Sequence, residues 1–324
     1  MPAGSPRRAL ETIMIDESGV DTGEYVIPPS PGEILPPPEV SAKVQVDLAA
    51  MSHQGKVRTT NQDHYLVTRL ERSLETVATN LSEGLVPKRF AEVGYGMLVA
   101  DGMGGHAGGE VASRLAITTL VNLFLHTPDW IMREGTPEAE QIMERMAERY
   151  RIVDAAVREQ AQADPLLEGM GTTMTLACSL GSMLVLAHIG DSRVYLIRDS
   201  ECHQLTRDHT MAQGLIDLGI LRPEQAGGHR FKHMLTRVIG AGDSLGEPEV
   251  QQVTLADGDQ VLLCTDGLTD MVKPETISVI LRNSKTSNEA CQALIDAALE
   301  NGGLDNVTMA LARYRLPAEL ASTS

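Results

Sequence analysis

Three carboxylates in this sequence stand where an apolar run meets a turn. Asp101 follows the apolar run 97–100, Asp266 follows a second such run, and Asp305 precedes a third. Short apolar runs bounded by turn residues predict buried strands. Each carboxylate is therefore expected at the end of a strand, where the adjoining turn can open onto a site.

The loop after Asp101 is dense in glycine, at positions 102, 104, 105, 108 and 109. Glycine lets backbone carbonyl and N–H groups approach a ligand closely. A phosphate-cradling loop would place a lysine after its last glycine, and none follows here. A metal-binding loop needs a carboxylate with an adjacent free carbonyl, which this loop has. A tight structural turn with a helix-capping Asp is the alternative, and the other carboxylates weigh against it.

Five carboxylates occupy strand ends or comparable turns: Asp101, Asp191, Asp266, Asp270 and Asp305. If they converge, their charges repel, so the cluster implies cations. Oxygen ligands without Cys or His select Mg²⁺ or Mn²⁺. Asp101 is placed to bridge two ions, with the Gly102 carbonyl as a further ligand. Two such ions hold a water, lower its pKa and aim it at phosphorus, which predicts a phosphatase.

A polar segment, residues 58–63, adds two groups of a different kind. Arg58 carries a planar fork that can grip a phosphate, and Asp63 can order metal-bound water. A surface turn would explain each of them separately. Beside the carboxylates, they favour phosphate chemistry.

Charge excludes other classes of partner. The chain has 27 Lys and Arg against 44 Asp and Glu, a net charge of −17. This argues against duplex nucleic acid and against an acidic membrane surface as partners. A metal-dependent nuclease, which also uses paired carboxylates, is disfavoured for the same reason.

Cysteine usage and hydropathy bear on the compartment. The four cysteines, Cys178, Cys202, Cys264 and Cys291, are scattered and form no Cys-x-x-Cys pair. They are expected to be core thiols in a reducing compartment. No signal-peptide core follows the N-terminus and no apolar run is long enough to span a bilayer. The sequence predicts a cytoplasmic protein.

The rest of the pattern predicts the elements that position the site. Residues 1–42 hold eight of the sixteen prolines and are expected to form a disordered leader. The folded domain is expected at 43–316, with a mobile segment at about 206–240 over the site and a short tail at 317–324. Strands at 172–179, 183–189 and 193–197 predict an antiparallel meander. Helices are expected after the glycine loop up to residue 126 and at 137–163, 275–282 and 287–300. A last strand is expected at 307–313, and residues 70–94 are expected to form a helical or irregular insertion.

Six motifs in order resemble a known family. They are Arg58-Thr-Thr-Asn61-Gln62-Asp63, Asp101-Gly-Met-Gly-Gly105, Gly171-Thr-Thr173, Gly190-Asp-Ser-Arg193, Thr265-Asp-Gly-Leu-Thr-Asp270 and Asp305-Asn306. Together they resemble the bacterial form of the metal-dependent serine/threonine protein phosphatases of the PP2C type, over residues 44–314. The resemblance implies an α+β fold, with two stacked antiparallel sheets flanked by helices, the metals at one end and a flap at 206–240.

The resemblance also implies roles for single residues. Ligands of a two-metal Mn²⁺ or Mg²⁺ centre are expected at Asp101, the Gly102 carbonyl, Asp266 and Asp305. A third, weaker ion is expected at Asp191, Asp266 and Asp270. Arg58 would anchor the phosphate and Asp63 would hold metal-bound waters. The implied activity is hydrolysis of phosphoserine and phosphothreonine in proteins by a monomer that opposes a bacterial serine/threonine kinase.

Two positions depart from the family pattern. Gln62 replaces a glutamate found in many relatives, and Met103 replaces the histidine that eukaryotic members carry as a proposed general acid. Leaving-group protonation would then come from metal-bound water or from one of five histidines: His53, His64, His106, His209 and His233. A pseudophosphatase, in which the fold serves as a binding module, is the alternative function, although no metal carboxylate is missing.

Overall fold

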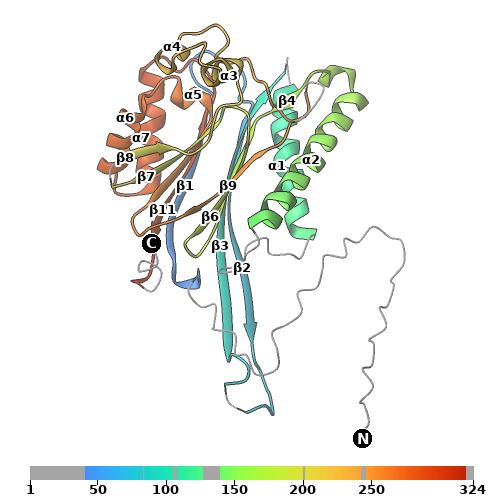
Figure 1. The fold of residues 1–324 in the computed structure, drawn as a ribbon, viewed down its shortest axis with the longest axis vertical. Helices are drawn as coiled ribbons and strands as arrows, with labels where there is room; N and C mark the ends of the chain where they lie inside the picture. The colour runs from blue at the N-terminus through green and yellow to red at the C-terminus, as the bar shows by residue number, and fades with distance from the viewer. Residues whose placement is uncertain are drawn as a thin grey trace, which may run out of the picture. The chain divides into compact units, whose positions relative to one another are not determined.

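Two antiparallel sheets face each other in the computed structural model, and helices cover the outer face of each (Figure 1). The structure describes residues 41–82, 84–104, 108–126, 139–199, 201–241 and 246–318. The predicted leader, apart from its last two residues, and most of the predicted tail lie outside these ranges. So do Gly105, His106 and the predicted start of the second helix at 137. The predicted α+β sandwich class is confirmed.

The first sheet has the order β1-β11-β10-β7-β8. Its strands are β1 (Gln45–His53), β7 (Arg193–Arg198), β8 (Glu201–Gln204), β10 (Gln260–Cys264) and β11 (Val307–Arg315). Helices α6 (Pro274–Asn283) and α7 (Ser287–Glu300) pack on its outer face. The last strand and both helices confirm the sequence prediction to within two residues.

The second sheet has the order β2-β3-β5-β6-β9, with the short β4 paired to the end of β3. Its strands are β2 (Asp63–Glu75), β3 (Arg89–Met103), β4 (Gly171–Thr172), β5 (Met174–Leu180), β6 (Met183–Ile189) and β9 (Glu249–Thr254). Helices α1 (Gly108–His126) and α2 (Ala139–Ala163) pack against it.

Short elements fill the connections between the layers. They are the 3₁₀ turns η1 (Ser41–Lys43) and η2 (Pro165–Leu167) and the helices α3 (Met211–Asp217), α4 (Pro223–Ala226) and α5 (Asp266–Thr269). Helices α3 and α4 lie within residues 206–240, called the flap segment below. Thr210 caps α3 through a hydrogen bond from the Gln213 N–H.

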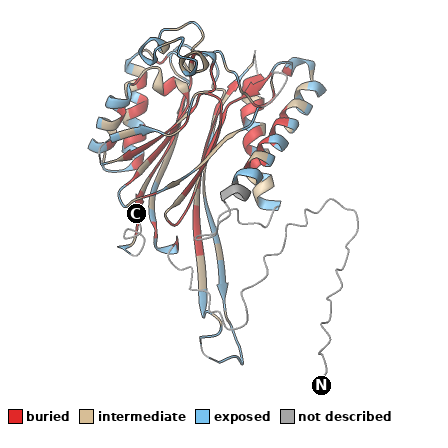
Figure 2. Cartoon of the chain, in the orientation of Figure 1, coloured by how far each residue is buried: buried red, intermediate tan, exposed pale blue. Residues whose placement is uncertain are grey.

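The central strands read as continuous apolar runs because both of their faces are buried (Figure 2). In β3, Met97 and Val99 enter the core between the sheets, whereas Leu98 and Ala100 enter the core beneath α1 and α2. Successive side chains of a strand alternate between faces, so one run supplies two cores. This double burial fixes the register that brings Asp101 to the end of the sheet.

The prediction of a helical or irregular insertion at 70–94 was wrong. β2 and β3 continue as paired strands from Asp63 opposite Asp101 to Glu75 opposite Arg89. Only residues 94–99 of β3 also pair with β5, so the far end is a two-stranded hairpin. The β2 part of that hairpin, residues 69–75, is mostly exposed and therefore lacks the apolar alternation that marks a half-buried strand.

The predicted meander was also wrong in its last step. β5 and β6 pair as expected, but β7 pairs with β10 and β8 in the other sheet. The turn at Gly190 makes this crossing, with φ of +113°, and a Cβ there would lie 2.5 Å from Thr173. Turn spacing alone does not distinguish a hairpin from a step between two sheets.

Two further sequence predictions concern the cysteines and membrane-spanning segments. All four cysteines are free thiols; Cys264 and Cys291 are buried, and Cys178 and Cys202 are partly buried. Within the described ranges, none of the helices combines the length and the hydrophobicity that a membrane span requires.

Candidate metal centre

Asp63 and Asp101 lie directly opposite each other where β2 and β3 pair. Asp63 is buried, and its Oδ2 accepts a hydrogen bond of 2.9 Å from the Thr265 hydroxyl. Its Oδ1 atom is buried without a hydrogen-bond partner in the part of the chain that the structure describes. Such an orphaned carboxylate oxygen fits a group that receives a hydrogen bond from a bound water.

Both backbone polar groups of Asp101 form hydrogen bonds. Its N–H donates to the Thr173 hydroxyl at 3.0 Å, and its carbonyl accepts from the Thr173 N–H at 2.9 Å and the Thr172 hydroxyl at 2.8 Å. These threonines belong to the predicted 171–173 motif. Their contribution is to fix the backbone of Asp101 at the end of β3.

The predicted carboxylates converge on Asp101. Burial raises the pKa of its carboxyl well above the usual range, and four neighbouring charges raise it further: Asp63, Asp266, Asp191 and Asp305. Mutual repulsion among buried carboxylates is removed either by protons or by cations. The chemistry of this donor set, all oxygen and strongly anionic, fits the hard divalent ions expected from the sequence.

Backbone packing positions Asp266 and Asp305. The side-chain amide of Asn306 donates to the carbonyls of Gln54 at 2.8 Å and Thr60 at 2.9 Å. The backbone N–H of Asn306 donates to Asp305 Oδ1 at 2.8 Å. Gly267, next to Asp266, lies so close to Asn306 that a Cβ would be 1.9 Å from its carbonyl oxygen.

Gly267→Ala is therefore expected to lower the free energy of unfolding by about 3 kcal/mol or more, at the upper end of overpacking costs. Chemical denaturation measures this. Gly214→Ala is the matched control, because a Cβ there meets nothing within 4 Å and alanine favours the helix α3. Equal denaturation midpoints for the two variants would contradict the prediction.

The glycine loop packs its own backbone tightly. A Cβ on Gly102 would lie 2.0 Å from the Gly109 carbonyl oxygen and 2.7 Å from that of Gln62. The Gln62 carbonyl accepts from the Gly102 N–H at 3.2 Å and from the Ser113 hydroxyl at 2.6 Å. Glycine at position 102 therefore allows the loop to close against the start of α1.

Arg58 lies at the edge of the cluster. Its Nη2 atom donates to Asp305 Oδ2 at 2.5 Å, and the two side chains are 55% and 35% exposed. The predicted phosphate anchor is thus oriented beside a predicted metal ligand, with a face open to solvent.

The carboxylates of the predicted third site have different partners. Asp191 is buried, and burial followed by repulsion from Asp266 raises its pKa to about 8. Asp270 forms ion pairs with Lys232 and His233 of the flap segment, and His233 also lies 3.2 Å from Asp266. Hydrogen bonds to Asp266 and Asp270 raise the pKa of His233 to about 10.

In protein stripped of metal by EDTA, the free energy of unfolding is expected to fall from pH 6.5 to about pH 8.5. Burial raises the pKa of Asp63 to about 7 and that of Asp191 to about 8, so the folded chain binds more protons than the unfolded chain. His233 acts in the same direction. The buried His188 and His209, whose pKa values are lowered to about 4 and about 3, act in the opposite direction, and their effect fades above about pH 7.5, where the unfolded histidines have also lost their protons.

Denaturation at both pH values, with EDTA or with saturating Mg²⁺, measures this effect. Mg²⁺ is expected to reduce the fall because it stabilises the ionised carboxylates. The same slope in both conditions would contradict the account of the cluster.

The candidate histidines differ in whether they contact the carboxylate cluster. His53 accepts from the Gly55 N–H, His64 bonds the Ser113 hydroxyl, and His209 is buried and accepts from the Gly190 N–H. His106 lies outside the described residues. Only His233, among those described, contacts the predicted metal carboxylates.

Sequence reasoning missed two contributors to the site. Lys232 reaches Asp270 from the flap segment, and no local pattern marks it. Asp154 on α2 accepts from the Gly240 N–H at 2.7 Å and fixes the end of the flap segment. Asp154 is a buried carboxylate on a helix, which is an unusual position for Asp and was the available signal.

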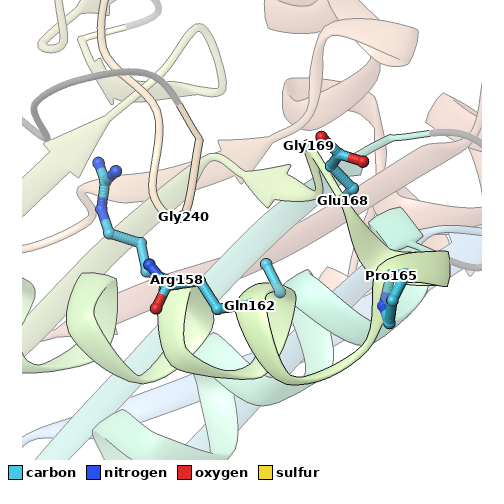
Figure 3. A pocket seen from close by; sticks show the side chains of 7 residues that line it. Arg158, Gln162, Pro165, Glu168, Gly169 and Gly240 are labelled. Carbon is cyan, nitrogen blue, oxygen red and sulfur yellow. The ribbon is translucent and has the colours of Figure 1, made fainter.

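A separate pocket of about 400 Å³ lies near the C-terminal end of α2 (Figure 3). Its lining residues are Arg158, Ala161, Gln162, Pro165, Glu168, Gly169 and Gly240. Arg158 pairs with Asp154 at 2.6 Å, which in turn holds Gly240. This pocket contains none of the predicted site residues.

A two-sheet sandwich with buried and half-buried carboxylates gathered at one end of both sheets defines a class of metal-binding sandwich proteins. The comparisons place the chain within that class. The protein phosphatase 2C family model matches residues 89–302. The chain belongs to the protein phosphatase 2C family.

Named relatives agree with this assignment. The chain is 39% identical to the serine/threonine protein phosphatase PstP of Mycobacterium tuberculosis, over 67% of this chain and 40% of that protein. It is 32% identical to the protein phosphatase PhpP of Streptococcus pneumoniae, over 82% of this chain and 96% of that protein. The chain thus spans about two fifths of the length of the mycobacterial relative.

Solved structures share the fold. The catalytic domain of PstP, solved with two manganese ions, has a TM-score of 0.65 and 35% identity, covering 84% of this chain and 100% of that one. The serine/threonine phosphatase of S. agalactiae has a TM-score of 0.66 and 30% identity, covering 84% and 100%.

Proposed function

We propose that this chain is a metal-dependent phosphatase that hydrolyses phosphoserine and phosphothreonine in proteins. The convergence of Asp63, Asp191, Asp266 and Asp305 on Asp101 carries the proposal. Membership of the protein phosphatase 2C family supports it.

Asp101, the Gly102 carbonyl, Asp266 and Asp305 would hold two Mn²⁺ or Mg²⁺ ions. When bound, these ions would lower the pKa of a water and stabilise charge on the phosphoryl oxygens. The 2.9 Å hydrogen bond from Thr265 and the orphaned Oδ1 of Asp63 fit a role for Asp63 in holding that water in position.

Arg58 would bind the phosphate. Its guanidinium already contacts Asp305, so the cation stands at the edge of the carboxylate cluster where a substrate anion would arrive. Charge-assisted hydrogen bonds to phosphate are stronger than neutral ones, and an arginine fork can make two in parallel. The net charge of −17 otherwise repels phosphate, which makes a local cation necessary.

The two residues that depart from the family pattern, Gln62 and Met103, are compatible with the proposed metal-dependent phosphatase. The Gln62 carbonyl is engaged by Gly102 and Ser113, and its neutral side chain is a weaker cation ligand than a carboxylate. Met103 is 39% exposed and brings no acid to the site. The pseudophosphatase alternative is disfavoured because all the expected carboxylates are present.

The wider assignments are proposals of the same kind. We infer that the substrates are phosphorylated proteins, that the partner activity is a bacterial serine/threonine kinase, and that the chain works as a cytoplasmic monomer. The names of the bacterial relatives support the substrate class.

Hydrolysis of a phosphothreonine peptide by the purified chain tests the proposal. Phosphate release is expected with Mn²⁺ or Mg²⁺ and is expected to stop when EDTA is in excess. A folded protein that binds the phosphopeptide but releases no phosphate at any metal concentration would instead support the binding module.

A further inference from the structure

The flap segment brings one imidazole into the carboxylate cluster. Nδ1 of His233 lies 3.2 Å from Oδ2 of Asp266, and Nε2 lies 3.2 Å from Oδ2 of Asp270. Donor atoms of Asp191, His233 and Asp266 all lie within 4.8 Å of one another. Ligands at ~2.0–2.2 Å from one ion are up to ~4.4 Å apart, so these three atoms need to move only slightly to share an ion.

Asp191 supplies an independent sign of a ligand. It is only 8% exposed, and among the described residues no other side chain donates a hydrogen bond to it or forms an ion pair with it. A buried carboxylate is costly to ionise without a partner. Its position in the mixed group with His233 and Asp266 points to a cation as that partner.

Asp270 already has two partners in the flap segment. Its Oδ1 pairs with the Lys232 ammonium and its Oδ2 faces Nε2 of His233. Histidines that bind metals usually donate the second ring N–H to a carboxylate, which fixes the ring orientation. Asp270 stands in that outer position, with Lys232 holding it.

We propose that the third cation site of this chain consists of Asp191, Asp266 and Nδ1 of His233, with Asp270 orienting the imidazole instead of binding the ion. This inference rests on the proposed metal-dependent function of the same cluster. Nδ1 gives its proton to water when the ion binds. An imidazole ligand favours Mn²⁺ over Mg²⁺, and the ion ties the flap segment to the site.

Pulsed electron paramagnetic resonance of bound Mn²⁺ tests the site directly, because a coordinated imidazole nitrogen modulates the signal. The nitrogen signal is expected only when the weakest of the Mn²⁺ sites fills. It is expected to shift when the protein contains histidine labelled with the heavy nitrogen isotope. Absence of a nitrogen signal from the protein saturated with Mn²⁺ would overturn the proposal.

Three variants separate the roles. His233→Gln is expected to abolish the nitrogen signal and weaken the last Mn²⁺ site at least ~10-fold. Asp270→Asn is expected to weaken it ~10–100-fold while the nitrogen signal remains. His229→Gln, which removes another flap imidazole, is expected to change neither. A nitrogen signal that persists in His233→Gln, or is lost in His229→Gln, would overturn the assignment.

Peptide hydrolysis on the same samples keeps the two proposals apart. Metal-dependent hydrolysis without a nitrogen signal would overturn only the His233 site. A nitrogen signal that depends on His233, from protein that hydrolyses nothing, would support the site and overturn the phosphatase proposal.

Discussion

Asp266→Asn is expected to lower kcat for phosphothreonine peptide hydrolysis by about 10³-fold or more. The carboxylate is assigned to the two-ion centre and also contacts His233. Replacing it with a neutral amide weakens ion binding. The bound ions would stabilise the charge of the transition state by several kcal/mol, and a loss of about 1.4 kcal/mol corresponds to a tenfold lower rate. Steady-state assays over a range of Mn²⁺ concentrations measure the effect.

A matched control separates this loss from a general effect of charge. Asp296→Asn removes a carboxylate that is exposed on α7, where it accepts a hydrogen bond from Gln292, and is expected to leave the rate unchanged. The Asp266→Asn protein is expected to remain folded by circular dichroism. Full activity of folded Asp266→Asn at saturating Mn²⁺ would contradict the metal assignment.

Arg58→Ala is expected to lower kcat/KM by about 10²-fold, mainly through a higher KM. Loss of charge-assisted hydrogen bonds to phosphate costs about 1.5–3 kcal/mol. Arg58→Lys keeps the charge but not the fork, so it is expected to recover part of the loss. Inhibition by inorganic phosphate, measured in parallel, is expected to weaken in the same order.

The surface ion pair of Arg151 with Glu148 provides the control for Arg58. Arg151 is 52% exposed, close to the 55% of Arg58, and contacts its partner at 2.9 Å on α2. Arg151→Ala is expected to leave KM unchanged because exposed pairs contribute little. An equal rise in KM for both variants would show that Arg58 acts only through the overall charge of the protein.

Residue types and their neighbours were sufficient to predict which carboxylates converge. Carboxylates next to Gly or Asn at the ends of apolar runs can be recognised locally, because double burial makes the strands hydrophobic and the turns need glycine. The fold class and the family followed from the same motifs. No single run, however, indicated which sheet a strand joins.

The hairpin of β2 and β3 and the crossing of β7 were decided by tertiary structure. The β2 strand of this hairpin is mostly exposed beyond residue 68, so its sequence carries no period that marks a strand. The turn at Gly190 leads from one sheet to the other. Strand β7 pairs with β8 and β10, and both of these strands belong to the first sheet.

The sequence by itself determined the carboxylates, the glycines between them and the family to which the chain belongs. Tertiary structure alone decided that Lys232 and His233 reach Asp270 and Asp266, 38 and 33 residues away along the chain. Asp154 likewise reaches Gly240 across 86 residues. Local patterns report which side chains are buried and where turns occur, whereas contacts over such separations depend on how the flap segment and the sheets pack together.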